Sequence, residues 1–208
     1  NDTTVYPLAY TPGSARLYVN GILQAAPAVT AGPPLVFTGI NIPAGGNAIL
    51  IYEATVTQFA PLGAEDTITN TAVITGSGLS APITVEATIG TEDRADLTVS
   101  KAVCPAVVTE NGQLTYTFVI ENYGNTPAVA TDDVVLTDTF DPIFNPITVT
   151  FNGTPWTEGV EYTYDETTGL FTTTVGQITV PAATYTQAED GTFVVTPGTA
   201  VLTVTGTV

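Results

Sequence analysis

Histidine and methionine are absent from this 208-residue chain, and cysteine occurs once, at Cys104. Without histidine, one chain cannot build a Ser-His-Asp triad, a Cys-His dyad or a histidine-containing zinc site. A single cysteine cannot form a disulfide within the chain, so Cys104 is predicted to be a small apolar residue or a link between chains. Because there is no initiator methionine, we expect a processed product or a fragment. No catalytic constellation can be assembled, and we expect the protein not to be an enzyme.

Positive charge is also scarce, because 3 Lys and Arg oppose 20 Asp and Glu and the formal net charge is −17. Such a chain repels the phosphates of nucleic acids and anionic membrane surfaces, so we expect neither as a partner. The sequence contains no run of about 18 apolar residues, so no membrane span is predicted. The composition favours a secreted protein that is extracellular or attached to a cell surface.

Long runs of good helix formers are missing as well. The apolar residues are mainly Val, Ile, Ala and Tyr, and they alternate with abundant Thr. Beta-branched and aromatic side chains suit a pleated, half-buried surface, and 19 Gly and 15 Pro punctuate the apolar segments. The sequence therefore predicts an all-β protein.

An internal repeat divides the chain into two copies. The matching segments are 17–21 with 149–153, 37–44 with 171–182, and 48–56 with 200–208. The first pair shares an Asn-Gly dipeptide, which is typical of a type I′ hairpin turn. Because the three matches keep the same order, we predict two tandem immunoglobulin-like antiparallel β-sandwiches. The first covers residues 1–91, the second covers 97–208, and a short polar linker occupies 92–96.

Each predicted sandwich is incomplete within this chain. The first copy continues through strands at 66–75 and 83–89 that the second lacks, and the second opens with three strands that the first lacks. Unpaired strand edges invite strand addition from another chain. We expect the joining edge at the last strand, with Val201, Leu202, Val204 and Val208. Either the natural chain is longer at its N-terminus, or a neighbouring identical subunit supplies the missing strands; both can hold together.

Several segments carry a resemblance to a known family. Segments 97–103, 112–125 and 135–140 resemble the conserved repeat domain of bacterial surface proteins, also catalogued as the eleventh domain of unknown function. Segment 68–74 is similar to the last strands of that domain. More narrowly, the chain resembles the small secreted two-copy members of anaerobic Firmicutes. Those members typically carry an N-terminal segment that reads like Thr-Asn-Gln-Ala-x-Leu-Thr-Tyr, which is absent from this sequence; the resemblance implies that such a segment is a donor strand for another subunit. The resemblance also implies a surface or wall-associated role.

Three polar residues fall in phase with apolar neighbours on predicted strands. Lys101 alternates with Leu97, Val99 and Val103, and the same phase argument turns Asp138 and Asn70 inward. An inward Lys, Asp and Asn resemble the arrangement of isopeptide-bonded pilin domains, where a neutral Lys attacks an Asn amide. The alternative is a buried ion pair between Lys101 and Asp138 without covalent chemistry. Because neither copy holds all three residues, Lys101 could meet an Asn only from a donor strand.

No cofactor is expected, although the acidic residues leave room for one alternative. Asp132, Asp133, Asp138 and Asp141 could offer calcium the oxygen ligands that it prefers, but their spacing is not that of an EF-hand. The sequence thus predicts the structural subunit of an extracellular bacterial filament or surface fibre, assembled head to tail from identical subunits by β-strand complementation. The alternative is a surface stalk or adhesin module that binds host or matrix ligands.

Overall fold

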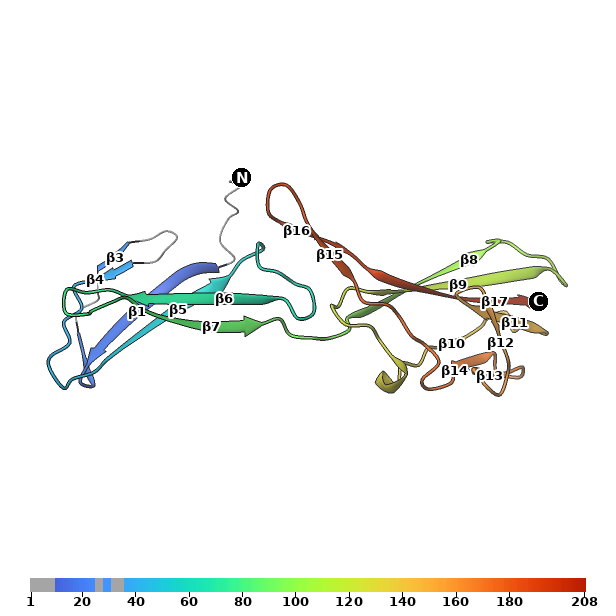
Figure 1. Cartoon of the computed structure of the whole chain (residues 1–208). Coiled ribbons are helices and arrows are strands. Elements are labelled where there is room, and N and C mark those ends of the chain that lie inside the picture. The colour runs from blue at the N-terminus through green and yellow to red at the C-terminus, as the bar shows by residue number, and fades with distance from the viewer. Residues whose placement is uncertain (1–9, 25–27, 31–35) are drawn as a thin grey trace. The chain divides into compact units, whose positions relative to one another are not determined.

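The computed structural model describes residues 10–24, 28–30 and 36–208, and it consists of antiparallel β-strands (Figure 1). Within these described ranges the one helical element is a single 3₁₀ turn, η1 (Ala130–Asp132). The all-β prediction is therefore confirmed. The chain forms two compact units: residues up to 62 with 66–90 and 187–194, and residues 63–65 with 91–186 and 195–208. Residues 1–9 of the predicted first sandwich lie outside the described residues.

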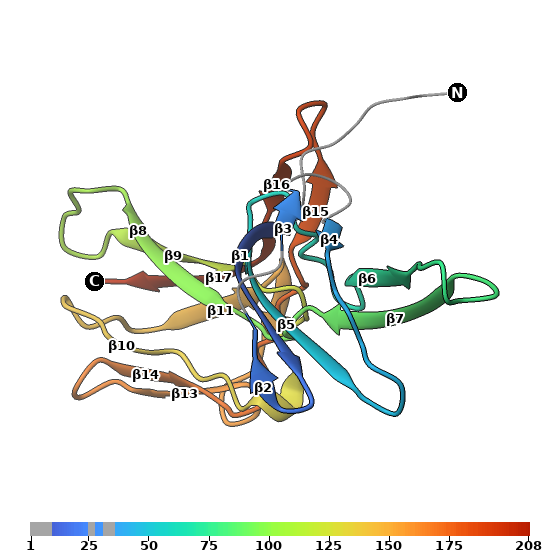
Figure 2. The same ribbon diagram turned by 90° about the vertical axis from the view of Figure 1, so that its left-hand side faces the viewer.

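The second unit is organised around a five-stranded sheet. Its strands, in spatial order, are β12 (Thr154–Trp156), β11 (Ile147–Phe151), β17 (Gly198–Thr207), β9 (Gln113–Asn122) and β8 (Leu97–Cys104). Strand β17 lies in the middle, since it pairs with β11 on one side and with β9 along its whole length on the other. Strands β8 and β12 are the edges of this sheet. Figure 2 shows β8 beside β9 at one edge.

A smaller sheet of the same unit has the order β10 (Thr137–Thr139), β14 (Leu170–Thr173) and β13 (Tyr162–Asp165). A separate hairpin joins β15 (Thr184–Gln187) to β16 (Phe193–Thr196). One apolar cluster joins the two sheets, because alternate residues of both contribute to it. Its buried members are Leu114, Phe118, Ile120, Ala128, Phe140, Phe144, Val149, Phe151, Tyr162, Tyr164, Phe171, Ile178, Val180, Ala200, Leu202 and Val204.

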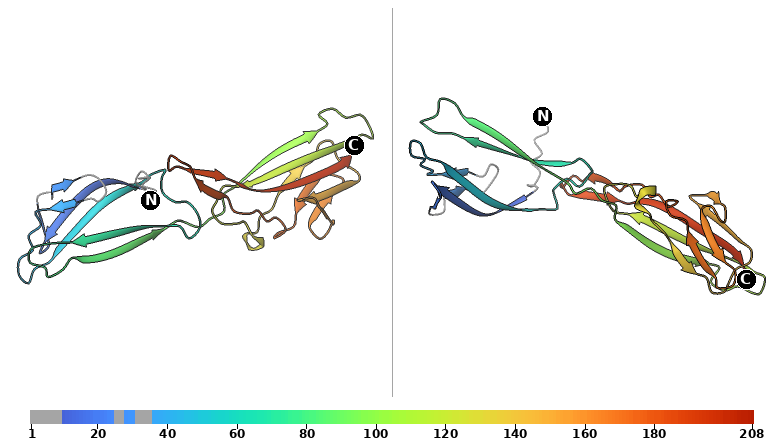
Figure 3. Two further views of the ribbon diagram at one scale, coloured as in Figure 1. Left: turned by 45° about the horizontal axis from the view of Figure 1, so that its top comes forward. Right: turned by 90° about the horizontal axis from the view of Figure 1, so that it is seen from below.

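The first unit contains three small sheets. They are β2 (Ile22–Leu23) with β1 (Tyr10–Val19) and β5 (Ala48–Val56), the pair β3 (Ala28–Thr30) and β4 (Val36–Thr38), and the hairpin of β6 (Thr67–Ile74) and β7 (Ile83–Gly90). Figure 3 shows β6 and β7 as a two-stranded ribbon. Among the described residues of this unit, the buried hydrophobic side chains are Leu17 and Ala60. The first unit therefore lacks a core like that of the second within the part that the structure describes.

The repeat is visible in the structure as the same hairpin in both units. Asn20 and Gly21 join β1 to β2 with positive φ angles of 51° and 79°, and Asn152 and Gly153 join β11 to β12 with 49° and 78°. Positive φ at both central residues is what a type I′ turn requires, which confirms the predicted turns. In each unit the asparagine side chain also accepts a hydrogen bond from the backbone of a neighbouring segment, just before β5 in the first unit and within β17 in the second. Asn20 Oδ1 accepts a hydrogen bond from the backbone of Asn47, and Asn152 Oδ1 accepts one from the backbone of Val201.

Candidate functional site

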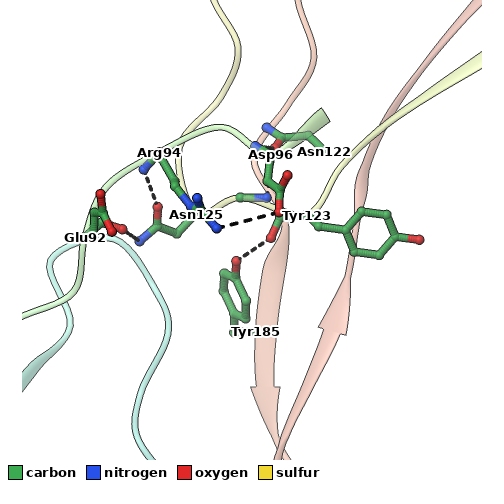
Figure 4. A network of polar contacts seen from close by, with 8 residues as sticks. Glu92, Arg94, Asp96, Asn122, Tyr123, Asn125 and Tyr185 are labelled. Carbon is green, nitrogen blue, oxygen red and sulfur yellow. Dashed lines mark hydrogen bonds and ion pairs between the residues drawn. The ribbon is translucent and has the colours of Figure 1, made fainter. Parts of the chain in front are cut away.

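Asn122 is a fully buried polar side chain at the end of β9 (Figure 4). It lies beside Asp96, which stands just before the first strand of the second unit. Its Oδ1 accepts hydrogen bonds from the backbone N–H groups of Asp96 and Gly124, both at 2.9 Å. Its Nδ2 donates to the carbonyl oxygens of Thr126, at 2.8 Å, and Pro181, at 3.0 Å. The oxygen and the nitrogen of the Asn122 amide thus each have two hydrogen-bond partners inside the protein. Sequence reasoning missed Asn122, although its phase with Leu114, Phe118 and Ile120 on β9 placed a polar residue toward the core.

A second asparagine fixes the segment that precedes β8. Asn125 Oδ1 accepts from the backbone of Arg94, and its Nδ2 donates to the carbonyl of Glu92 (Figure 4). The backbone also approaches closely here, because a Cβ added at Gly124 would lie 2.1 Å from the carbonyl oxygen of Arg94. The predicted linker at 92–96 is therefore held within the second unit by side chains from the β9 end.

Lys101 and Asp138 form an ion pair across the two sheets of the second unit. Lys101 is paired in register with Phe118, so its side chain leaves β8 on the core-facing side. Its Nζ lies 4.3 Å from the ring centroid of Tyr116 and 5.7 Å from that of Phe140, within the range of cation–π contacts. The side chains remain 39% and 20% exposed, so the ion pair is only partly desolvated.

The three predicted polar residues are not all brought together. The structure places Lys101 beside Asp138, as the ion-pair interpretation predicts, whereas Asn70 lies on β6 of the first unit. Asp138 also accepts a hydrogen bond from the backbone of Thr139. An amide acceptor for Lys101 would therefore have to come from a strand that docks here.

The core-facing side of β8 is largely uncovered. Val99 and Val103 lie opposite Ile120 and Tyr116 in the register, and so face the core side, yet they are 61% and 43% exposed. Strand β10 is an edge strand of the smaller sheet, and no described strand extends that sheet over β8. A cleft of about 550 Å³, lined among others by Leu97 and Val134, opens at the start of β8. We call the strip between β8 and residues 134–140 the open side of the second unit.

The β6–β7 hairpin has one apolar and one threonine-rich face. The register pairs Ile68 with Ile89, Asn70 with Ala87, Ala72 with Val85, and Ile74 with Ile83, so these eight side chains share one face. On the other face Thr69 contacts Thr88 and Thr71 donates to Glu86. The apolar face is uncovered, since Ile89 is 66% exposed and Val85 56%. Asn70 is the polar residue in the middle of this apolar face.

The predicted joining edge differs from what the structure shows. Val201, Leu202 and Val204 lie in β17, which is paired on both sides, and Leu202 and Val204 are fully buried. Val208 follows β17, and its backbone bonds to Gly112 and Asn111. The reason lies in the strand order. Strand β11 pairs with one side of β17 and β9 pairs with the other side, so β17 has no free edge. The open strand edge beside the exposed apolar side chains belongs instead to β10.

Two of the four acidic residues proposed for calcium are engaged separately. Asp132 accepts a hydrogen bond from the backbone of Val129, and Asp138 pairs with Lys101. Within the described ranges, no three His, Cys, Asp or Glu side chains gather as a metal site would require. Cys104 is a free, exposed thiol at the end of β8. In the same described residues, no helix has the length and apolar character needed to cross a bilayer.

Searches of protein-family models, curated proteins and solved structures find no match to this chain. The resemblance of the sequence to the conserved repeat domain therefore stays a prediction. The features of the described structure that bear on function are the open side of the second unit and the uncovered apolar face of the β6–β7 hairpin in the first.

Proposed function

We propose that this chain is the structural subunit of an extracellular bacterial filament or surface fibre, assembled head to tail by β-strand complementation. In this proposal each unit is an immunoglobulin-like sandwich that a strand from a neighbouring identical subunit completes. The observation that carries it is the pair of uncovered apolar surfaces, one on β8 and one on the β6–β7 hairpin.

The β6–β7 hairpin supports the proposal because it is not expected to be stable alone. A two-stranded hairpin in water needs a further strand or a packed layer on its hydrophobic face. Here four large side chains of one face, Ile74, Ile83, Val85 and Ile89, are about half exposed or more. Covering each such side chain contributes about 1–2 kcal/mol, so association that buries the face is favourable.

The edges of the second unit differ in how they are protected. Strand β12 carries Pro155, and proline lacks the N–H group that a further strand would need. Strand β10 contains no proline and pairs with β14 alone, although the outward N–H of Thr139 already donates to the side chain of Asp138. Leu136 bonds to Thr173 of β14 and Phe140 bonds to Gly169 just before it, so alternation turns the N–H of Thr137 away from β14. The β10 edge is thus suited to accept an added strand.

Charge and composition support a place outside the cell. A net charge of −17 with 11% charged residues leaves a surface that is dominated by Thr and other neutral polar groups. Strand complementation relies on backbone hydrogen bonds and apolar contact, which do not require ion pairs between subunits. Because copies that each carry a net charge of −17 repel one another, added salt is expected to favour their association by screening this repulsion.

The test is concentration-dependent assembly of the purified chain, measured by sedimentation velocity and negative-stain electron microscopy. We expect particles that grow with concentration into fibres without any ligand. The variant Thr137→Pro should abolish growth, because it removes the outward N–H of β10, whereas Thr137→Ala keeps that N–H and should assemble normally. A chain that stays monomeric at every concentration contradicts the proposal and favours a surface stalk or adhesin module.

A further inference from the structure

The open side of the second unit sets three requirements for its occupant. The occupant needs a strand that extends the smaller sheet beyond β10 and apolar side chains that cover Val99 and Val103. It also needs a polar group at the ion pair of Lys101 and Asp138, because burying an ion pair without further hydrogen bonds is unfavourable.

The β6 strand satisfies these requirements in length and pattern. Strands β6 and β8 both have 8 residues. The apolar face of β6 presents Ile68, Asn70, Ala72 and Ile74, and the core-facing side of β8 presents Leu97, Val99, Lys101 and Val103. Each is a set of alternate positions in which a single residue is polar.

The direction of docking follows from β10. Leu97 and Val134 line the same cleft, and Lys101 pairs with Asp138, four residues further along on each segment (97 to 101 and 134 to 138). Residues 134–140 therefore run in the same direction as β8. The strand pairings of the first unit and those of the five-stranded and smaller sheets of the second are all antiparallel. We therefore place the added strand antiparallel to β10 and hence to β8, and the order 74, 72, 70, 68 then meets 97, 99, 101, 103. This alignment puts Asn70 opposite Lys101.

We infer that the β6–β7 hairpin of one copy docks its apolar face on the open side of the second unit of another copy, with the Asn70 amide at the Lys101–Asp138 ion pair. The inference rests on the proposed function and names the segment and residues that would carry it. An asparagine amide can accept from the Lys101 ammonium and donate to the Asp138 carboxylate at once. Asn70 is thereby the polar group that the buried ion pair requires.

The chain's own hairpin cannot reach this position. In the docked alignment Ile68 faces Val103 at the C-terminal end of β8, which we call its far end. Gly90 pairs with Thr67, the residue next to Ile68, so Gly90 also lies near this far end. The near end is about 20 Å away, at about 3.3 Å for each residue from 97 to 103. Residues 92–96 are fixed at that near end by Asn122 and Asn125. The two residue steps from 90 to 92 span only about 7 Å, so the occupant is a second copy.

Such a joint connects two different surfaces of identical molecules. A contact of this kind does not close on itself unless the rotation happens to form a ring, and it otherwise repeats into an open fibre. The docked hairpin therefore accounts for head-to-tail growth with a single type of interface.

Disulfide trapping in the full-length chain tests the pairing. In a Cys104→Ser background, Asn70→Cys protein is mixed with Lys101→Cys protein and oxidised mildly. We expect a disulfide-linked heterodimer on a non-reducing gel. The matched control, Thr71→Cys mixed with Lys101→Cys, should give none, because Thr71 lies on the threonine-rich face.

A second pair guards against loss of assembly when Lys101 is replaced. Ile68→Cys mixed with Val103→Cys should also crosslink, whereas Ile68→Cys with Val99→Cys, out of register, should not. In addition, Asn70→Leu should raise the concentration needed for assembly about tenfold, which corresponds to about 1.4 kcal/mol.

The outcomes separate this inference from the proposed function. Fibres of the unmodified chain, seen by sedimentation, without either predicted crosslink would refute the hairpin pairing and leave strand complementation standing. Fibres with equal crosslinking in the out-of-register control would also refute the pairing. An unmodified chain that forms no fibres would refute the proposed function itself.

Discussion

Asn122 is expected to contribute more to the stability of the second unit than any other single polar side chain described above. It makes four hydrogen bonds of 2.8–3.0 Å and is fully buried. Replacement by alanine leaves two backbone N–H groups and two carbonyls without these partners. At about 1 kcal/mol for each bond, Asn122→Ala should lower the free energy of unfolding by about 4 kcal/mol. For a domain with a total stability of about 5–15 kcal/mol, this loss is large.

The assay uses the single tryptophan of the chain. Trp156 packs on Phe151 with ring centroids 4.9 Å apart, so its fluorescence reports the second unit alone. We expect the melting temperature of that transition to fall by roughly 15–25 °C. The control is Asn125→Ala: this side chain is only half-buried, so water can replace part of its hydrogen bonding and the loss should be about 1 kcal/mol. A loss below about 1 kcal/mol for Asn122→Ala would show that the network does not hold the loops together.

Three further predictions concern the turns and the joint. Asn152→Ala should cost about 2–3 kcal/mol by Trp156 fluorescence, because it loses the bond to Val201 and forces alanine to a positive φ; Asn152→Gly should cost only about 1 kcal/mol, and equal losses would contradict this account. Hydrogen bonds from Thr167 and Thr168 lower the pKa of Asp165 to about 2, so its contribution to stability is present above about pH 4 and is lost as the pH falls toward 2. Between pH 5 and pH 2, the urea midpoint of the wild type should fall more than that of Asp165→Asn, and parallel curves would refute the linkage. Fibres should dissociate to monomers in hot detergent, because the proposed joint is held by backbone hydrogen bonds, apolar contact and the Asn70 amide at the Lys101–Asp138 ion pair, and none of these is covalent; a resistant ladder whose mass is lower by one ammonia per joint would instead show an amide between Lys101 and Asn70.

Local sequence patterns predicted correctly those features that depend on a single physical principle. The repeated Asn-Gly dipeptides predicted the hairpin turns at Asn20 and Asn152, because positive φ at both turn positions strongly restricts residue choice. Strand alternation predicted that Lys101 and Asp138 face the same interior, since a period of two fixes the side on which each residue lies. Neither prediction depends on knowing which strands are neighbours.

Predictions that depend on strand order were less successful. The last strand, with Leu202 and Val204, was expected at an edge because it ends the chain's final repeat, but β9 pairs with it along its length. Sequence pattern alone does not state which of two apolar strands becomes the neighbour of a third. The role of Asn122 was hidden for a related reason. Its four partners come from segments as far apart as Asp96 and Pro181, and only the fold brings them to one point.

The most direct test of strand complementation is electron cryo-microscopy of assembled material, with density traced beside β10. The account predicts a strand from a neighbouring copy that runs antiparallel to β10 and covers Val99 and Val103, with its Asn70 at Lys101. Discrete particles in which the edge of β10 stays unpaired would contradict it.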